Sequence, residues 1–297
     1  MELRHFRYFI AVAEELNFHR AAKRLNISQP PLSVTIAQLE AEIGTRLFLR
    51  EKKIVSLTDA GRKFLEHARE VMSCKEEAVI SAQLAAEGKI GRISFAFVGS
   101  AVTGYLQNAM RIFQDSYPNV DIDMVQANNQ DIIARLVKGE IDFGVMRLPV
   151  DIPVNFKIYA EQKDKYCLAV PSNHALAKRK LVRIDEIAEE ELILFPRKVA
   201  KKHYDHMISI YTDHGYSPNI VLEPREQNTT AALISSGMGI SIVPSCMKFL
   251  PVPHITHIDI TGIQQRTGIA VLAPMSPTPI IQNFIDSCED NMTRSFR

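Results

Sequence analysis

The sequence has few features of a membrane or exported protein. None of its 297 residues falls in an apolar run near the roughly 18 residues that a membrane-spanning helix needs. The N-terminal segment MELRHFRYF is charged and has neither the apolar core nor the cleavage site of a signal peptide. Hydrophobic residues make up 46% and charged residues 23% of the chain, as in ordinary globular proteins. We therefore expect a cytoplasmic protein of two or three domains with no membrane partner.

Cysteine is scarce, and its spacing argues against a disulfide framework. The four cysteines, Cys74, Cys167, Cys246 and Cys288, lie far apart and form no CxxC pair. This pattern favours reduced thiols that pack as small hydrophobic groups. One alternative stays open, because Cys167 and Cys246 fall on separate predicted strands and are candidates for the disulfide of an oxidant sensor.

Motifs of common enzymes are also missing. The sequence contains no GxSxG, HExxH or P-loop motif and no complete GxGxxG. His203 and His206 have helical spacing that could place two metal ligands on one face, but Asp205 is the only acidic partner at ligand spacing. We therefore predict a protein that is not an enzyme and that needs no cofactor.

The first 65 residues combine positive charge with a pattern of short helices. They hold 11 Lys and Arg against 7 Asp and Glu, whereas the rest of the chain holds 24 against 27. Apolar spacings of three and four predict a helix over residues 3–16, and a short helix follows in FHRAAKRLN. Ser28 then caps a third helix that Gly44 ends. A basic helical head of this kind suits DNA binding.

These helices have the order and spacing of a helix-turn-helix. In that motif the second helix enters the major groove, and its N-terminal side chains reach the base edges. Glutamine can pair with adenine, and hydroxyl groups can serve a base or a phosphate. The DNA-contacting residues predicted here are Ser28, Gln29, Pro30, Pro31, Ser33 and Thr35. The alternative is a structural helix in which Ser28 and Gln29 only form a capping box.

A hairpin and a long helix follow. The segment RLFLREKKIVSLTDAGRKF predicts two short strands around a turn, and we expect Arg50, Lys52 and Lys53 to contact phosphates. Thr58 then caps a helix that runs from about Asp59 to about Glu87 with an apolar face. A helix this long cannot bury that face against a small head, so we expect it to pair with a second subunit.

The segment from Met1 to about Leu65 resembles the winged helix-turn-helix of LysR-type transcriptional regulators. The resemblance rests on AVAEELNFHRAAKRLNISQPPLSVTIAQLEAEIGTRLF, on the SQPPLS start of the recognition helix and on the LT-x-AG opening of the linker helix. It departs at Val34, because members often carry a basic residue directly after the LS of this helix. The resemblance implies a homo-oligomer, a dimer of dimers, that binds double-stranded promoter DNA and contacts RNA polymerase.

Strands and helices alternate in the rest of the chain. RISFAFVGS, VDIDMVQA and IDFGVMRL predict strands of a first half, and DKYCLAVPS, LILFP, PNIVLEP and ISIVPS predict strands of a second. This order predicts α/β halves with parallel sheets and covering helices. The two halves resemble a periplasmic-binding-protein-like fold, and in the LysR family the first half includes the C-terminal strand and helix. A solute-binding protein is the alternative for this part alone, but it would lack the helix-turn-helix.

The resemblance implies a winged helix-turn-helix followed by a linker helix and a two-subdomain α/β effector domain. Its segments are a DNA-binding domain over 1–58, a linker and dimerisation helix over 59–88, subdomain I over 91–161 plus 268–297, and subdomain II over 162–267.

Polar residues follow several predicted strands, where helix N-termini point toward a cleft between the halves. Free N–H groups at such termini favour an anion, and nearby cations add charge-assisted donors. The effector-binding residues predicted here are Ser100, Asn129, Arg147, Lys202, His203, Gln227 and Asn228. Each has a structural alternative, namely an N-cap that faces water, an ion pair with a surface acid or a solvated loop charge.

The C-terminal part is similar to regulators of aromatic-compound catabolism that respond to benzoate- or muconate-like acids. The similarity lies in FVGS, LILFP, DHG-x-x-P and SSGMGISIVPS. Asn129 stands where those regulators have a threonine, and His203 stands where they have an aromatic ring. The resemblance thus implies a small aromatic or dicarboxylic acid as the effector.

Overall fold

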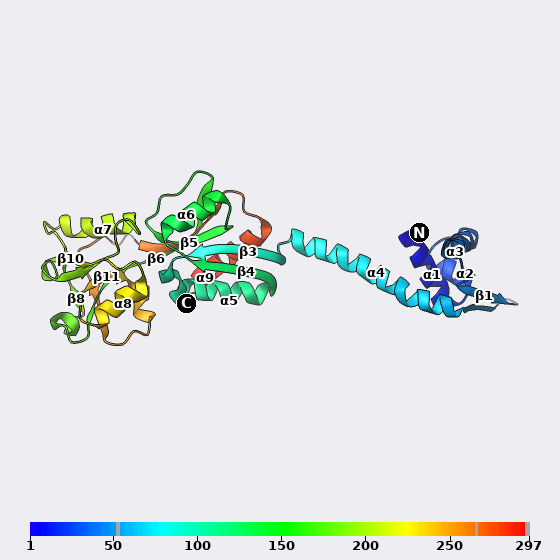
Figure 1. Cartoon of the computed structure of the whole chain (residues 1–297), viewed down its shortest axis with the longest axis horizontal. Coiled ribbons are helices and arrows are strands. Elements are labelled where there is room, and N and C mark those ends of the chain that lie inside the picture. The colour runs from blue at the N-terminus through cyan, green and yellow to red at the C-terminus, as the bar shows by residue number, and fades with distance from the viewer. Residues whose placement is uncertain (52–53, 265–266, 295–297) are drawn as a thin grey trace. The chain divides into compact units, whose positions relative to one another are not determined.

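The computed structural model describes residues 1–51, 54–264 and 267–294, which divide into two compact units (Figure 1). Unit 1 spans Met1–Leu84, and unit 2 begins at Ala85. The elements of unit 1 are α1 (Leu3–Glu15), α2 (Phe18–Arg24), α3 (Gln29–Ile43), β1 (Phe48–Glu51), β2 (Ile54–Leu57) and α4 (Asp59–Ala86), whose last residues reach unit 2.

The core of unit 1 forms where three short helices meet the hairpin. Helical spacing predicts a buried apolar stripe of Leu32, Ile36, Leu39 and Ile43 in α3. The first three are fully buried, and Ile43 at the end of the helix is half-buried. Phe9 of α1 lies 5.1 Å from Phe48 of β1, between ring centroids, and these rings join the helices to the hairpin. β1 and β2 pair in antiparallel fashion, as a wing.

The long helix α4 begins at a side-chain cap and buries little of its length. The Gly61 N–H donates to Oγ1 of Thr58 at 2.8 Å, as the sequence predicts for a capping threonine. Along the helix Val71, Val79 and Ile80 are exposed. None of the described helices is both long and apolar enough to cross a membrane.

Unit 2 contains two α/β lobes. Lobe I has a five-stranded sheet of order β4-β3-β5-β13-β6, covered by α5, α6 and α9. Phe95, Phe113, Phe143 and Phe284 pack together in its core, with ring centroids 4.5–5.5 Å apart. The elements of lobe I are β3 (Ile90–Phe97), α5 (Gln107–Ser116), β4 (Asn119–Gln126), α6 (Asn129–Lys138), β5 (Phe143–Leu148), β6 (Phe156–Asp164), β13 (Thr267–Pro274) and α9 (Pro279–Arg294).

Lobe II has a four-stranded sheet of order β11-β7-β12-β8 and a parallel pair of β10 and β9. Its core includes Leu168, Ile210, Ile242 and Ile258. The elements of lobe II are β7 (Tyr166–Pro171), β8 (Leu181–Val182), β9 (Glu191–Ile193), α7 (Lys201–Thr212), β10 (Asn219–Leu222), α8 (Gln227–Ser235), β11 (Ser241–Pro244) and β12 (Ile255–Ile260).

The sheets are mixed, so the expectation of parallel sheets is correct only in part. In lobe I, β3 pairs in parallel with β4 and β5, but β13 pairs in antiparallel fashion with β5 and β6. In lobe II, β7 is antiparallel to both of its neighbours. β6 and β13 are the segments by which the chain leaves lobe I and returns to it, and such strands need no covering crossover helix. β6, β8 and β12 are strands that the sequence pattern does not predict.

Candidate functional site

The N-terminal end of α3 is exposed to solvent and carries polar side chains. Ser28 occupies the N-cap position, but its side chain makes no capping hydrogen bond. The capping box that was the structural alternative for Ser28 and Gln29 is therefore not formed. Gln29, Pro30 and Pro31 are also exposed, and the prolines lie in the first turn. This end of the helix can approach a groove without losing internal bonds.

Further along α3, three neighbouring residues differ in their exposure to solvent. Ser33 and Thr35 are half-buried, and the Thr35 hydroxyl donates to the Pro31 carbonyl at 2.8 Å. Val34 between them is 56% exposed. The outer face of α3 thus presents an apolar side chain at the position where the resemblance leads one to expect a cation.

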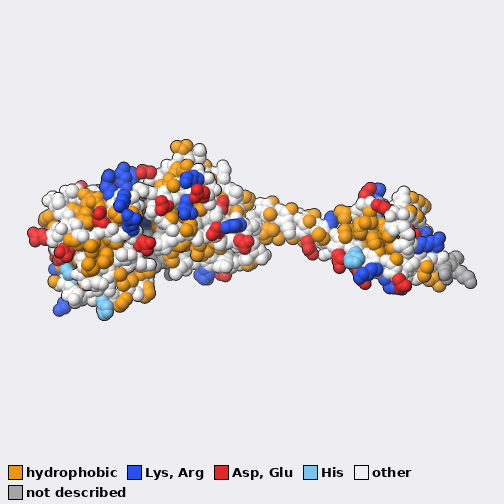
Figure 2. All heavy atoms as spheres, in the orientation of Figure 1, with side chains coloured by type: hydrophobic (Ala, Val, Ile, Leu, Met, Phe, Trp, Pro, Cys, Tyr) orange, Lys and Arg blue, Asp and Glu red, His pale blue; other side chains and the backbone are white. Residues whose placement is uncertain are grey.

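Arg50, the wing cation within the described residues, is held against unit 1 itself. Its guanidinium lies 4.6 Å from the centroid of the Phe18 ring, and Nη2 is 3.7 Å from Oε2 of Glu40. Lys52 and Lys53, the other two predicted phosphate contacts, lie outside the described residues. Figure 2 shows Lys and Arg side chains gathered at the end of unit 1 where α3 and β1 lie.

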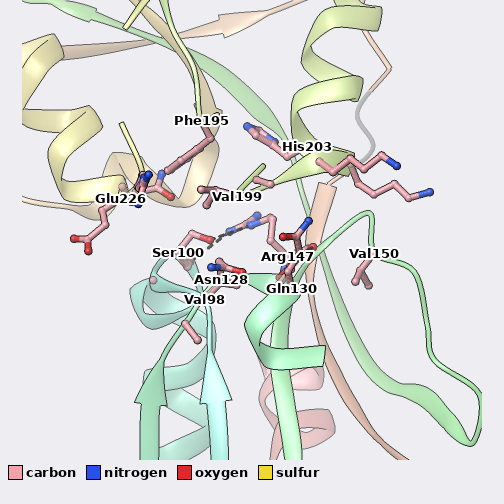
Figure 3. A pocket seen from close by; sticks show the side chains of 18 of the residues that line it. Val98, Ser100, Asn128, Gln130, Arg147, Val150, Phe195, Val199, His203 and Glu226 are labelled. Atoms are coloured by element: carbon pink, nitrogen blue, oxygen red, sulfur yellow. Dashed lines mark hydrogen bonds between the residues drawn. The ribbon is translucent and has the colours of Figure 1, made fainter. Parts of the chain in front are cut away.

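Unit 2 contains a cavity of about 500 Å³ between its two lobes. Lobe I contributes Ser100, Asn128, Gln130 and Arg147 to its wall, and lobe II contributes Phe195, Val199, His203 and Glu226 (Figure 3). The two sets of side chains face each other across the opening. We call this cavity the cleft.

Four chain turns bring helix N-termini to the cleft. Ser100 lies in a short 3₁₀ helix after β3, and α6, α7 and α8 begin at Asn129, Lys201 and Gln227. The N-terminus of α6 is capped, because the Asn128 side chain accepts from the Asp131 N–H at 3.0 Å. α7 and α8 have no side-chain cap. Their first N–H groups therefore have no side-chain partner.

Arg147, at the end of β5, is buried and fully engaged at the junction of the lobes. Its Nη1 donates to Oδ2 of Asp164 at 2.8 Å, and Nε donates to Oγ of Ser100 at 3.1 Å. Nη1 also donates to Oγ1 of Thr267 at 3.3 Å, and Nη2 donates to Sγ of Cys246 at 3.2 Å. Cys246 belongs to lobe II, so one guanidinium connects both lobes. The ion-pair alternative for Arg147 is therefore realised, with a buried acid in place of a surface acid.

Asp164 completes this network at the end of β6. It accepts from Oγ of Ser245 at 2.5 Å and from the Lys165 N–H at 2.7 Å, in addition to Arg147. Burial alone would raise the pKa of Asp164, but the bonds from Ser245 and Arg147 hold it below its ordinary value. The carboxylate is therefore charged and matches the guanidinium charge. Asp164 and Cys246 were missing from the predicted site, because their contacts join segments far apart in the sequence.

The mouth of the cleft carries a second ion pair. Nζ of Lys202 in α7 lies 2.9 Å from Oδ1 of Asp151, which follows β5 in lobe I. Both side chains are exposed, and both line the cleft. Figure 2 shows Lys and Arg side chains gathered where α6 and α7 face each other. The predicted effector ligand Lys202 thus already has a carboxylate partner.

His203 lies between two aromatic rings in lobe II. Its ring centroid is 6.0 Å from those of Tyr166 and Phe195. Burial, together with the nearby charge of Arg147 and with His206, lowers the pKa of His203 to about 4. The imidazole is therefore neutral near pH 7. Among the described residues no group of three or more His, Cys, Asp or Glu is placed to hold a metal ion.

Three other predicted residues differ in their placement. Asn129 lines the cleft, but its amide is bound to the β5 backbone, donating to the Arg147 carbonyl at 2.7 Å and accepting from the Arg147 N–H at 3.2 Å. Asn228 is exposed and is not among the residues that line the cleft. Gln227 does line it, and its Nε2 is buried without a hydrogen-bond partner among the described residues.

The oxidant-sensor alternative finds little support in thiol chemistry. Cys167 is fully buried, and burial raises the pKa of its thiol to about 12. A thiol of that pKa contributes almost no thiolate near neutral pH. Cys246 is half-buried beside Arg147.

Comparisons with known proteins cover nearly the whole chain. Residues 3–62 match the family described as "Bacterial regulatory helix-turn-helix protein, lysR family", and residues 86–293 match "LysR substrate binding domain". The transcriptional regulator AlsR of Bacillus subtilis is 34% identical over 297 residues, covering 99% of this chain and 98% of that protein. The regulator BenM of Acinetobacter baylyi is 32% identical over 274 residues, covering 91% and 89%.

A solved structure with DNA is also similar. Full-length CbnR in complex with its target DNA has a TM-score of 0.86 and 28% identity, covering 98% of this chain and 99% of that chain. The matched families and these relatives are regulators of transcription rather than enzymes.

Proposed function

The chain belongs to the LysR family and is a DNA-binding transcriptional regulator with an effector-binding domain, and we propose that a small carboxylate bound in the cleft is its effector. The observation that carries this proposal is the meeting of Ser100 with the N-termini of α6, α7 and α8 at one cavity. Helix N-termini attract anions through their N–H groups and their dipoles. The uncapped starts of α7 and α8 offer such groups in lobe II.

The remaining ligands of the effector come from both lobes. Ser100 and Asn129 stand on the lobe I side, and Lys202, His203 and Gln227 stand on the lobe II side. Arg147 acts on the effector indirectly, because its guanidinium donates a hydrogen bond to the Ser100 hydroxyl and so positions it. An anion that binds between the lobes favours one lobe arrangement, and this differential affinity is what couples a ligand to a change of state.

At the DNA, Gln29 and Ser33 are the proposed base readers, with Ser28 and Thr35 as hydroxyl contacts to base or phosphate. Pro30 and Pro31 shape the helix start, and the wing residues Arg50, Lys52 and Lys53 are the proposed phosphate contacts. Arg50 must then leave or share its contact with Glu40.

The proposed working form is an oligomer. The exposed Val71, Val79 and Ile80 of α4 provide an apolar face for the same helix of a second subunit. Two such dimers would grip an inverted repeat at a promoter, in the cytoplasm, beside RNA polymerase. Effector binding would change how the dimers sit on the DNA.

A matched pair of serine variants tests the proposal. The promoter DNA upstream of the regulator's own gene is titrated in gel shifts with and without benzoate, succinate or butanoate. We expect Ser100→Ala to abolish any effect of these acids on DNA binding, with DNA binding itself retained. The control is Ser287→Ala, a buried serine of α9 whose hydroxyl donates to the Asn283 carbonyl away from the cleft. An unaltered response in Ser100→Ala would remove Ser100 from the site.

A further inference from the structure

The charges around the cleft balance one another and supply no net positive charge for a ligand with two carboxylates. Four cations and three carboxylates belong to the wall, namely Arg147, Lys201, Lys202, Arg225, Asp131, Asp151 and Glu226. Arg147 is matched by Asp164 behind the wall, and Lys202 is matched by Asp151. Lys201 and Arg225 form no ion pair with the described residues, and Asp131 and Glu226 have no cationic partner there either. With Asp164 included, four cations stand against four carboxylates, so the wall has no surplus positive charge.

The first carboxylate is assigned to the helix N-termini and Ser100, and a second would add a negative charge that the balanced wall does not offset. His203, the other titratable group of the lobe II wall, is neutral near pH 7, since burial and Arg147 hold its pKa to about 4. Glu226 and Asp131 lie at the starts of α8 and α6, where they would repel an extra negative charge. Moving an unpaired carboxylate into this wall costs much more than moving an uncharged polar group.

Two polar groups of lobe II are nevertheless available to form hydrogen bonds with a ligand. Nε2 of Gln227 is buried with no acceptor among the described residues, and a ligand that supplies an acceptor would satisfy this buried donor. The His203 imidazole likewise makes no hydrogen bond to the described residues. A neutral imidazole offers one donor and one acceptor. Both side chains can therefore recognise an uncharged hydroxyl or carbonyl group.

Apolar side chains line the space around these polar groups. Val98 and Val150 come from lobe I, and Phe195 and Val199 come from lobe II (Figure 3). Such a wall favours a hydrocarbon body between the two polar ends of a ligand.

We infer that the cleft selects a monocarboxylate whose other end is an uncharged hydroxyl or carbonyl group, recognised by Gln227 and His203. The inference rests on the proposed carboxylate-binding role of the cleft and narrows it. A dicarboxylate of the same length is then a poor ligand, although both classes satisfy the broader proposal.

Two matched series of probes test the inference on the full-length protein by isothermal titration calorimetry. One consists of benzoate, 4-hydroxybenzoate and terephthalate, and the other of butanoate, 4-hydroxybutanoate and succinate. In at least one series we expect the hydroxy acid to bind about tenfold more tightly than the dicarboxylate, with the unsubstituted acid between them. Tightest binding of the dicarboxylate in each series that binds would overturn the inference and leave the carboxylate proposal standing. No binding by any of the six acids would contradict both.

Variants then assign the preference to side chains. Gln227→Met keeps the length of the side chain and removes its donor, and His203→Phe keeps a ring between Tyr166 and Phe195. Each is expected to reduce the preference for the hydroxy acid over the unsubstituted acid at least threefold. The matched control is Gln282→Met, because Gln282 of α9 bonds to Asp286 and does not line the cleft. If both cleft variants keep the full preference, these residues do not read the uncharged end and the inference fails.

Discussion

The outer surface of α3 and the cleft of unit 2 present their polar side chains in different states. On α3, Ser28 and Gln29 are exposed, and the Ser28 side chain makes no capping bond. In the cleft, Arg147 and Lys202 already have carboxylate partners at 2.8 and 2.9 Å. DNA can dock on α3 without displacing a partner of Ser28, whereas an anion that recruits either cleft cation must compete with a carboxylate. The exposed face of α3 thus suits direct docking on DNA. The cleft suits a ligand whose binding exchanges internal ion pairs and so shifts the protein between states.

The largest effect is expected from removing the buried ion pair of the cleft, Arg147 with Asp164. Asp164→Asn leaves the Arg147 guanidinium buried without its counter-charge, so we expect the free energy of unfolding to fall by about 3 kcal/mol. Urea unfolding followed by circular dichroism measures it. Asp151→Asn is the control, because it breaks the exposed pair with Lys202 and should cost at most about 0.5 kcal/mol. Equal losses in the two variants would show that burial does not distinguish the pairs.

A pH titration tests whether the cleft keeps the His203 imidazole neutral. The folded pKa of His203 is about 4, below the ordinary value of 6.5, so the unfolded chain takes up its proton first as the pH falls. Stability from this group is therefore complete above pH 6.5 and is lost between pH 6.5 and pH 4. At pH 5 the loss amounts to at most about 2 kcal/mol.

The measurement compares unfolding free energies at pH 7.5 and pH 5. His203→Phe should show a smaller fall than the unsubstituted protein, which is the reference for both pH values. A fall unchanged by His203→Phe would mean that this imidazole titrates as in water.

The same comparison explains what the sequence could and could not predict. The buried stripe Leu32, Ile36 and Leu39 follows from helical spacing, because that signal is local. The polar turns at Ser100 and Gln227 were predicted as cleft residues for a similar reason, since each follows a strand directly. The partners of Arg147 were not predictable, because Asp164 and Cys246 reach it through the crossing of the chain between lobes.

Sheet direction shows the same limit. The alternation of strands and helices predicts parallel pairing, and β3 with β4 and β5 obeys it. The antiparallel position of β13 depends on a return from lobe II that no local pattern encodes. The two ion pairs of the cleft depend on this topology, whereas the face of α3 does not.

At the DNA surface, Val34→Arg tests whether the exposed face of α3 is open to a new contact. A cation at this 56% exposed position should reach a phosphate or a base, and the slope of log affinity against log salt should steepen by about 0.9. Affinity for promoter DNA should rise on the order of fivefold at low salt. Val137→Arg is the control, since Val137 is an exposed valine of α6 in unit 2. An unchanged salt slope would place Val34 away from the DNA.

The smallest expected effect concerns the exposed cleft pair. Lys202→Ala removes a cation of the cleft wall and frees Asp151, so the affinity for the best-binding monocarboxylate probe should fall about threefold at low salt. The fall should vanish near 1 M salt, where screening acts over only a few ångströms. Lys198→Ala is the control, because Lys198 is exposed nearby without lining the cleft. If the two variants behave alike, Asp151 keeps Lys202 from the ligand and the anion is held by the helix N-termini and Ser100 instead.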